Sequence, residues 1–339
     1  MPLRLYWNPH VVPLPGAVGA PLAFHRRLPG YAETPLRELP GLAADLGVGR
    51  LWIKDESRRL GLPSFKILGA SWATYRALER RLGGLPPWNS LAELRAHLSP
   101  LRPLALAAAT DGNHGRAVAR MAALLGLEAR IFVPTGTAAA RIEAIQGEGA
   151  QVTVVDGTYD EAVALAAREA GPRCMVISDT SWEGYEEVPR EVIAGYGTIF
   201  AEADAQLAAL GEPRPDLIAV QIGVGALAAA VVQHYRGLGE HPQPLRIIGV
   251  EPLGAACALA SMEAGRIVEV PGPHTSIMAG LNCGQPSPLA WPAVSRGVDL
   301  FMAVEDDAAR RAMRALAAEG VTAGETGAAG VAGLLELLA

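Results

Sequence analysis

The sequence of 339 residues has few aromatic residues, few charges and only three cysteines. Charged residues make up 19% of it and the formal net charge is −6 without a basic cluster, which argues against nucleic acid as the main partner. No apolar run is long enough to cross a bilayer, and no apolar core of a secretory signal follows Met1–Arg4. Cys174, Cys257 and Cys283 form no C-x-x-C pair. We therefore expect a cytoplasmic protein with no membrane partner.

Half of the residues are hydrophobic, which suffices for a large core and for two domains. Short runs that are apolar at successive positions alternate with helical patterns, as expected for strands covered on both faces. These runs lie at residues 104–110, 129–134, 150–156, 174–178, 217–222 and 245–252. The alternation predicts repeated β-α-β units, hence an α/β fold with open, mostly parallel sheets covered by helices. We expect the polar, proline-bearing stretch 83–103 to connect two lobes.

Lys66 stands in the otherwise apolar run "PSFKILGAS" at 63–71, shortly after a further predicted strand at 50–56. A lysine in such a run commonly lays its stem on apolar surface and extends its amine to water. The alternative is an amine that burial keeps neutral, so that it acts as a nucleophile or forms a Schiff base. This run alone favours the first explanation.

Ligands of open α/β sheets bind at the carboxyl ends of the strands. The predicted strand ends offer the segments 110–114, 178–180 and 223–225, so two carboxylates, an amide and a glycine turn are expected at one edge. The turn "GVGA" at 223–226 fits an anion cradle, a dinucleotide-binding turn or an ordinary tight turn. Asp111 and Asp179 fit catalytic carboxylates, or a helix cap and a turn residue. No motif indicates a metal site.

The segments "SFKILGAS" (64–71), "ATDGNHGRAVA" (109–119) and the glycine turn follow one another as in the fold-type II pyridoxal-phosphate (PLP) enzymes, the tryptophan synthase β-like superfamily. Within it the chain most resembles the diaminopropionate ammonia-lyases, a likeness carried by "DTSWEGY" and other stretches from about residue 31 onward. The resemblance implies a homodimer of two-lobed subunits. Residues 75–184 would form a smaller lobe with the asparagine loop, and 1–74 plus 185–339 a larger PLP-binding lobe.

The resemblance also implies roles for single residues. Lys66 would hold PLP as an aldimine, and Asp111 and Asp179 would be catalytic groups on opposite faces of the cofactor. The residues expected to contact the cofactor besides Lys66 are Asn113, Gly223, Val224, Gly225, Ala226 and Thr326, and those expected to bind a small amino-acid substrate are Thr110, Asp111, Gly112 and His114. The implied reaction is an α,β-elimination through an aminoacrylate intermediate, which converts 2,3-diaminopropionate to pyruvate and two molecules of ammonia.

The chain departs from this family near residue 339, where relatives continue into a strand whose hydroxyl meets the pyridine nitrogen. Either the sequence is a truncated one, or another hydroxyl such as that of Thr326 takes this role. Three alternatives to the lyase activity stay open. They are a PLP-dependent serine or threonine dehydratase, an NAD-dependent oxidoreductase built on the glycine turn, and a PLP-binding protein without catalysis.

Overall fold

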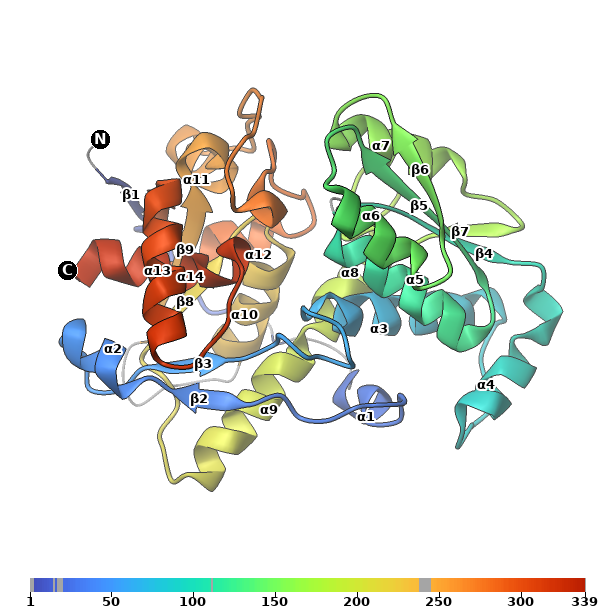
Figure 1. Ribbon diagram of the computed structural model, residues 1–339, viewed down its shortest axis with the longest axis horizontal. Coiled ribbons are helices and arrows are strands. Elements are labelled where there is room, and N and C mark those ends of the chain that lie inside the picture. The colour runs from blue at the N-terminus through green and yellow to red at the C-terminus, as the bar shows by residue number, and fades with distance from the viewer. Residues whose placement is uncertain (1–2, 15, 17–20, 111, 238–244, 339) are drawn as a thin grey trace. The chain divides into compact units, whose positions relative to one another are not determined.

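The computed structural model describes residues 3–14, 16, 21–110, 112–237 and 245–338, and the chain divides into two compact units (Figure 1). Unit 1 comprises residues 1–19, 33–57 and 199–339, and unit 2 comprises residues 20–32 and 58–198. Residues 75–184 all lie within unit 2, and the predicted lobe boundaries themselves stay a prediction.

Unit 2 contains a fully parallel sheet in the order β6-β5-β4-β7. Its strands are β4 (Ala105–Ala109), β5 (Glu128–Pro134), β6 (Gln151–Val155) and β7 (Cys174–Val176). Its helices are α1 (Pro21–His25), α3 (Lys66–Arg81), α4 (Leu91–His97), α5 (Asn113–Leu125), α6 (Ala139–Gln146), α7 (Tyr159–Arg168) and α8 (Glu187–Gly195). The short 3-10 helix η1 (Ser99–Leu101) follows α4.

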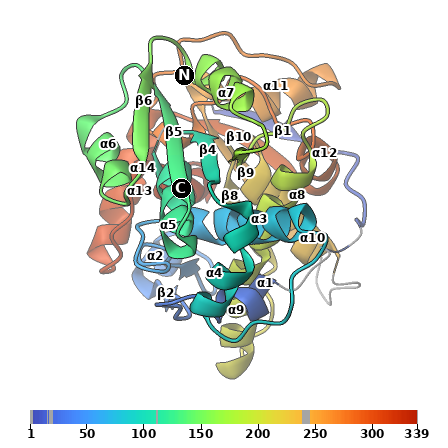
Figure 2. The same ribbon diagram turned by 90° about the vertical axis from the view of Figure 1, so that its right-hand side faces the viewer.

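Helices cover both faces of this sheet, which explains why its inner strand β4 is apolar at every position. Ala105, Ala107 and Ala109 of β4 pack with α7. Helix α5 lies against β4 and β5 as well (Figure 2), and it comes so close that a Cβ on Gly115 would meet Ile131 at 2.7 Å. All five residues of β4 are buried as a result.

Unit 1 contains a sheet in the order β1-β10-β9-β8, in which β1 is antiparallel to β10 and the other pairs are parallel. Its strands are β1 (Arg4–Trp7), β8 (Leu217–Gln221), β9 (Arg246–Pro252) and β10 (Leu300–Val304). A separate antiparallel pair is formed by β2 (Leu36–Glu38) and β3 (Trp52–Lys54).

The helices of unit 1 enclose its main core on that sheet. They are α2 (Pro40–Asp45), α9 (Gly197–Ala209, which begins at the end of unit 2), α10 (Ala226–Arg236), α11 (Cys257–Ala264), α12 (Trp291–Gly297), α13 (Asp306–Ala318) and α14 (Glu325–Leu338), with 3-10 helices η2 (Leu253–Ala255) and η3 (Ala279–Leu281). Helices α13 and α14 bury Val250, Leu300 and Met302. Small residues allow α14 to approach closely, since a Cβ on Gly333 would meet Val250 at 2.5 Å.

The predicted strands of the β-α-β pattern are all present, and the α/β architecture with parallel sheets and helical cover is confirmed. Two expectations need correction. The strand ends do not share one edge, because 110–114 and 178–180 belong to the sheet of unit 2 whereas 223–225 belong to that of unit 1. The stretch 83–103 lies wholly within unit 2 and contains α4, whose N-cap Ser90 accepts a hydrogen bond from the Glu93 amide.

Among the described residues, none of the helices has the length and hydrophobicity that crossing a membrane requires.

Candidate functional site

Lys66 is the first residue of helix α3, which has no acidic residue in its first turn. The unpaired amide groups at this end of a helix carry a partial positive charge, which disfavours an ammonium group nearby. The side chain of Lys66 is 26% exposed. Its amine is therefore neither extended fully into solvent nor sealed off from it.

Asp179 is the direct partner of Lys66. Its Oδ2 atom lies 2.8 Å from Lys66 Nζ, and its side chain is 9% exposed. Burial alone would raise the pKa of this carboxyl, but the nearby His114 and the Lys66 ammonium together lower the pKa below its usual range. Asp179 is thus a carboxylate held close to the amine, in the position that a base for proton transfer at this amine requires.

His114 lies near the same oxygen of the Asp179 carboxylate as Lys66 does. It is buried on α5, and its Nε2 atom lies 2.8 Å from the carbonyl oxygen of Ile177. Because a carbonyl oxygen only accepts hydrogen bonds, Nε2 must carry the hydrogen. The Nδ1 atom lies 3.8 Å from Asp179 Oδ2 and makes no hydrogen bond with the residues that the structure describes. His114 therefore faces the carboxylate rather than open space.

The loop after β7 fixes Asp179 through Tyr185, a half-buried tyrosine. The Tyr185 hydroxyl donates to the Val176 carbonyl at 2.7 Å and accepts from the Ser178 amide at 3.1 Å. Burial raises the pKa of Tyr185, so this hydroxyl stays protonated and can make both contacts. The ring stacks on Trp182 with centroids 4.1 Å apart. These contacts give the "DTSWEGY" segment a defined conformation next to the carboxylate.

The asparagine loop follows the neighbouring strand β4. Thr110 is buried and its Oγ1 atom accepts a hydrogen bond from the Gly112 amide at 2.9 Å. Asn113 is exposed and begins α5. Since β4 and β7 are adjacent and parallel, their carboxyl ends bring this loop and Asp179 to the same edge of the sheet. Asp111, the second predicted catalytic carboxylate, lies outside the described residues.

The glycine turn in unit 1 leads from β8 into helix α10. Gly225 is the N-cap of the helix and has φ +99°, a conformation that favours glycine. Gly223 is closely covered, since a Cβ there would lie 3.0 Å from the Gly280 carbonyl oxygen and 3.3 Å from Cys283 Sγ. The amides of such a turn at a helix start form a cradle for an anion. Ala226 is the first helical residue and supplies no side-chain donor.

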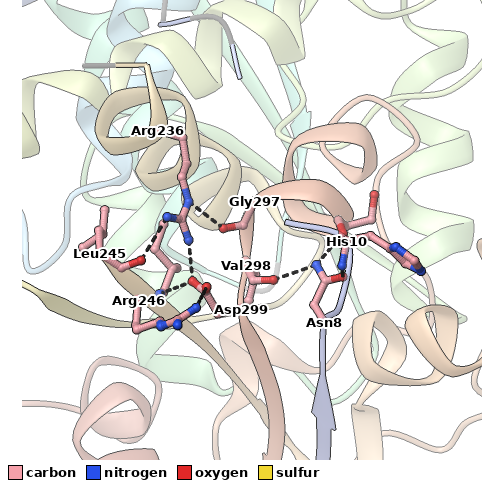
Figure 3. A network of polar contacts seen from close by, with 10 residues as sticks. Asn8, His10, Arg236, Leu245, Arg246, Gly297, Val298 and Asp299 are labelled. Carbon is pink, nitrogen blue, oxygen red and sulfur yellow. Dashed lines mark hydrogen bonds and ion pairs between the residues drawn. The ribbon is translucent and has the colours of Figure 1, made fainter. Parts of the chain in front are cut away.

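The far end of α10 is anchored by a network around buried Asp299 (Figure 3). Arg236 donates to the Asp299 carboxylate and, at 3.2 Å, to the Gly297 carbonyl. The same carboxylate accepts from Arg246 at 3.0 Å and from the Ile247 amide at 2.7 Å. The helix that carries the turn is thereby held to strands β9 and β10.

Thr326 lies in the first turn of α14, and its Oγ1 atom accepts a hydrogen bond from the Gly280 amide at 3.2 Å. The hydroxyl is therefore next to the segment that covers Gly223. Its predicted contact with the pyridine nitrogen stays a prediction. Among the described residues, no group of three histidine, cysteine or acidic side chains is arranged to hold a metal ion.

The structure thus brings Lys66, Asp179 and His114 together in unit 2, and Gly223–Ala226 with Thr326 in unit 1.

Tyr196 is a residue near Lys66 that the sequence did not predict. Its ring centroid lies 5.9 Å from Lys66 Nζ, although 130 positions separate the two residues in the sequence. No local pattern around "AGYGT" indicates this contact, because it arises from the packing of α3 against α8.

The family described as pyridoxal-phosphate dependent enzyme matches residues 27–339. The chain is similar to the diaminopropionate ammonia-lyase of Salmonella typhimurium, with 40% identity over 94% of this chain and 81% of the relative. It is also similar to a crystal structure of diaminopropionate ammonia lyase from Escherichia coli in complex with an aminoacrylate-PLP azomethine reaction intermediate. For that structure the TM-score is 0.87, with 33% identity over 98% of this chain and 86% of that chain. The biosynthetic L-threonine dehydratase of Mycobacterium tuberculosis is 30% identical over 99% of this chain and 72% of its own length.

Proposed function

The chain belongs to the family of pyridoxal-phosphate-dependent enzymes, and from this premise we propose that it is a carbon–nitrogen lyase acting on 2,3-diaminopropionate. It is an enzyme of fold type II that eliminates ammonia from this substrate to give, after hydrolysis, pyruvate and a second ammonia. The observation that carries the proposal in the structure is the close approach of the Lys66 amine to the Asp179 carboxylate.

The residues present fit PLP as the cofactor. Lys66 offers a half-buried amine for its aldehyde, and the turn Gly223–Ala226 offers backbone amides for its phosphate. When bound, PLP supplies an aldehyde that condenses with amines and a ring that withdraws electrons from the adjacent carbon. We assign Asn113 to its ring oxygen and Thr326 to its pyridine nitrogen.

Asp179 is proposed to accept the proton from Cα of the substrate. While the Lys66 ammonium is its neighbour, the pKa of Asp179 is too low for this task. When the amine no longer carries its charge beside Asp179, burial raises the pKa of the carboxyl and is opposed mainly by His114, so the pKa moves toward the range of a useful base. His114 Nδ1 lies 3.8 Å from the carboxylate oxygen that Lys66 contacts.

The substrate is proposed to bind at the asparagine loop. The amides and the hydroxyl around Thr110 and Gly112 suit its carboxylate, and His114 is assigned to the same substrate site. Asp111 is proposed to transfer the proton on the face of the cofactor opposite Asp179. It also suits the second amino group of 2,3-diaminopropionate, because a carboxylate attracts a cation where a hydroxyl would not. We further propose that the protein is a cytoplasmic homodimer, in keeping with its acidic balance and with the resembling family.

The serine or threonine dehydratase alternative is weaker, since identity to the threonine dehydratase is 30% and to the ammonia-lyase 40%. Product stoichiometry distinguishes the two activities. Purified protein is supplied with 2,3-diaminopropionate, serine or threonine, and pyruvate, 2-oxobutyrate and ammonia are quantified. We expect two ammonia per pyruvate from 2,3-diaminopropionate, at a kcat/KM at least tenfold above that for serine. Faster turnover of serine or threonine, with one ammonia per keto acid, would identify a dehydratase.

The same preparation tests the other two alternatives, an NAD-dependent oxidoreductase and a PLP-binding protein without catalysis. Thermal protection by NAD(H), together with activity that survives replacement of Lys66, would indicate an oxidoreductase. PLP binding without turnover of any of these substrates would indicate a non-catalytic protein.

A further inference from the structure

Tyr196 lies beside the amine of Lys66, on unit 2, and is fully buried. Its ring packs edge-to-face on Phe65 with centroids 4.9 Å apart, and Lys66 Nζ lies 5.6 Å from the Phe65 centroid and 5.9 Å from the Tyr196 centroid. Within the described residues the Tyr196 hydroxyl makes no hydrogen bond of ordinary length and angle. A buried hydroxyl that lacks a well-formed hydrogen bond costs free energy, and the Lys66 amine is the polar group that lies near enough to interact with this one.

The position of Tyr196 is fixed by close packing of α3 on α8. A Cβ on Gly69 would meet the Tyr196 ring at 2.6 Å, and a Cβ on Gly195 would meet the Leu68 carbonyl oxygen at 2.6 Å. Buried His25 adds a polar contact, with its Nε2 atom 3.0 Å from the same Leu68 carbonyl and its Nδ1 atom 2.7 Å from Thr198 Oγ1. The first turn of α3 and the segment around Tyr196 therefore form one rigid part of unit 2.

The charge state of Tyr196 suits contact with an amine. Burial raises the pKa of its phenol to about 12, although the nearby charge of Lys66 opposes this effect. The phenol is thus neutral at any pH at which an amino-acid lyase works. A neutral hydroxyl donates to an uncharged amine and accepts from an ammonium, so it can hold Lys66 in either state.

We propose that Tyr196 is a positioning residue for Lys66, whose hydroxyl binds the lysine amine after the substrate has displaced it and orients it for its return. This inference rests on the proposed function, because it assumes that Lys66 alternates with the substrate amine. On return, the Lys66 nitrogen forms its bond to the aldehyde-derived carbon, the substrate-derived amine leaves from that carbon, and a proton passes from Lys66 to the leaving amine. Asp179 is then occupied by the substrate's proton, so a second partner for Lys66 is needed.

The test uses alanine, whose amino group can displace Lys66 but which has no β substituent to expel. Holoenzyme is mixed with increasing alanine in a stopped-flow spectrophotometer, and the observed rate of the cofactor's absorbance change is plotted against alanine concentration. The intercept of this plot measures the rate at which Lys66 returns. The slope measures the rate at which alanine displaces Lys66. For Tyr196→Phe we expect an intercept about 3- to 10-fold lower than in the wild type, the effect of losing one hydrogen bond, and an unchanged slope.

The matched control is Tyr235→Phe, which removes a half-buried phenol in unit 1 whose pKa is also raised by burial. It should leave both rates unchanged. An intercept for Tyr196→Phe equal to the wild type, in protein that melts within about 2 °C of it, would overturn the inference. If Tyr196→Phe does not fold, Tyr196→Gln replaces it, because glutamine keeps a hydrogen-bonding group at this position. An intercept for Tyr196→Gln below one third of the wild-type value would then contradict the positioning role of Tyr196. Wild-type protein whose absorbance does not respond to any amino acid would instead refute the proposed function.

Discussion

Lys66 Nζ and Asp179 Oδ2 lie 2.8 Å apart, so the amine predicted to hold the cofactor and a carboxylate predicted to act in catalysis form an ion pair. The pair joins the start of α3 to the end of β7 within one compact unit. Each side chain changes what the other can do. The carboxylate stabilises the ammonium, and the ammonium, together with His114, lowers the pKa of the carboxyl.

Asp179→Asn should remove proton transfer on one face of the cofactor only. Positioned general bases contribute about 10²- to 10⁴-fold to a rate, so kcat for one enantiomer of 2,3-diaminopropionate should fall by that factor. The other enantiomer should lose less than about tenfold. Steady-state kinetics with both enantiomers check this, and the reciprocal variant Asp111→Asn should show the opposite preference. Equal losses for the two enantiomers in either variant would contradict separate roles for the two aspartates.

Gly225→Ala should weaken cofactor binding because alanine tolerates φ +99° poorly. A Cβ there would also lie 3.3 Å from Val294 Cγ2. We expect the Kd for pyridoxine 5′-phosphate, which has the phosphate but no aldehyde, to rise at least tenfold in a calorimetric titration. Gly254→Ala is the control, since nothing lies within 4 Å of a Cβ at that position in the same unit. An unchanged Kd in Gly225→Ala would remove this turn from the phosphate site.

Ala226→Ser should strengthen binding at the same turn. A serine hydroxyl at the first residue of α10 adds a donor next to the backbone amides, and one net hydrogen bond is worth about 0.5–1.5 kcal/mol. The Kd for pyridoxine 5′-phosphate should therefore fall by about 2- to 10-fold. Weaker binding in this variant would show that the phosphate does not approach Ala226.

Gly195→Ala should destabilise unit 2, because a Cβ there would overlap the Leu68 carbonyl oxygen at 2.6 Å and Gly69 Cα at 2.8 Å. Overpacking of this kind costs about 1–3 kcal/mol of the free energy of unfolding. Gly197→Ala, where nothing lies within 4 Å, should be neutral or slightly stabilising. Urea titrations of the two variants measure the difference, and equal unfolding free energies would argue against the close packing of α3 on α8.

Glu251 predicts a pH dependence of stability. Burial raises the pKa of its carboxyl from 4.5 to about 8, although the Ala258 and Leu259 amides that bind it lower the pKa in part. Between these values the folded state binds a proton that the unfolded state has lost, so stability falls as pH rises from about 4.5 to 8. One such proton contributes a slope of at most about 1.4 kcal/mol per pH unit.

Glu251→Gln should lose this slope, whatever its absolute stability. Urea unfolding at pH 5, 6, 7 and 8 compares it with the wild type, and the difference in free energy between the two proteins should shift by more than 1 kcal/mol across the series. Parallel curves for the two proteins would show that Glu251 is ionised in the folded state.

The sequence was most informative where the signal is local. Successive apolar positions identified β4, β5 and β9, because strands buried on both faces cannot alternate with polar residues. Thr158 and Glu161 have the capping-box spacing that marks a helix start, and both hydrogen bonds of the box are present at the start of α7. The same spacing in Ser90 and Glu93 marks α4 and was overlooked in a stretch taken for a connection.

The sequence was least informative where contacts join distant segments. The pairing of Lys66 with Asp179 spans 113 positions, and it depends on β7 lying beside β4. Tyr196 reaches Lys66 only because Gly69 and Gly195 let two helices approach closely. Strand β10 and the antiparallel edge strand β1 were not predicted, since a long segment with two helices separates β10 from its parallel neighbour β9, and β1 precedes the β-α-β pattern. The identity of the site residues came from the family resemblance more than from periodicity.

The most direct test of the account is the visible absorption spectrum of purified protein before and after borohydride, for the wild type and for Lys66→Ala, followed by peptide mapping. The account predicts a cofactor band in the wild type that borohydride removes, with the reduced cofactor attached to the peptide that contains Lys66. Lys66→Ala should show no protein-bound band that can be reduced. A wild-type protein without such a band, or a reduced cofactor attached to another lysine, would contradict the central claim that Lys66 is the amine of a PLP site.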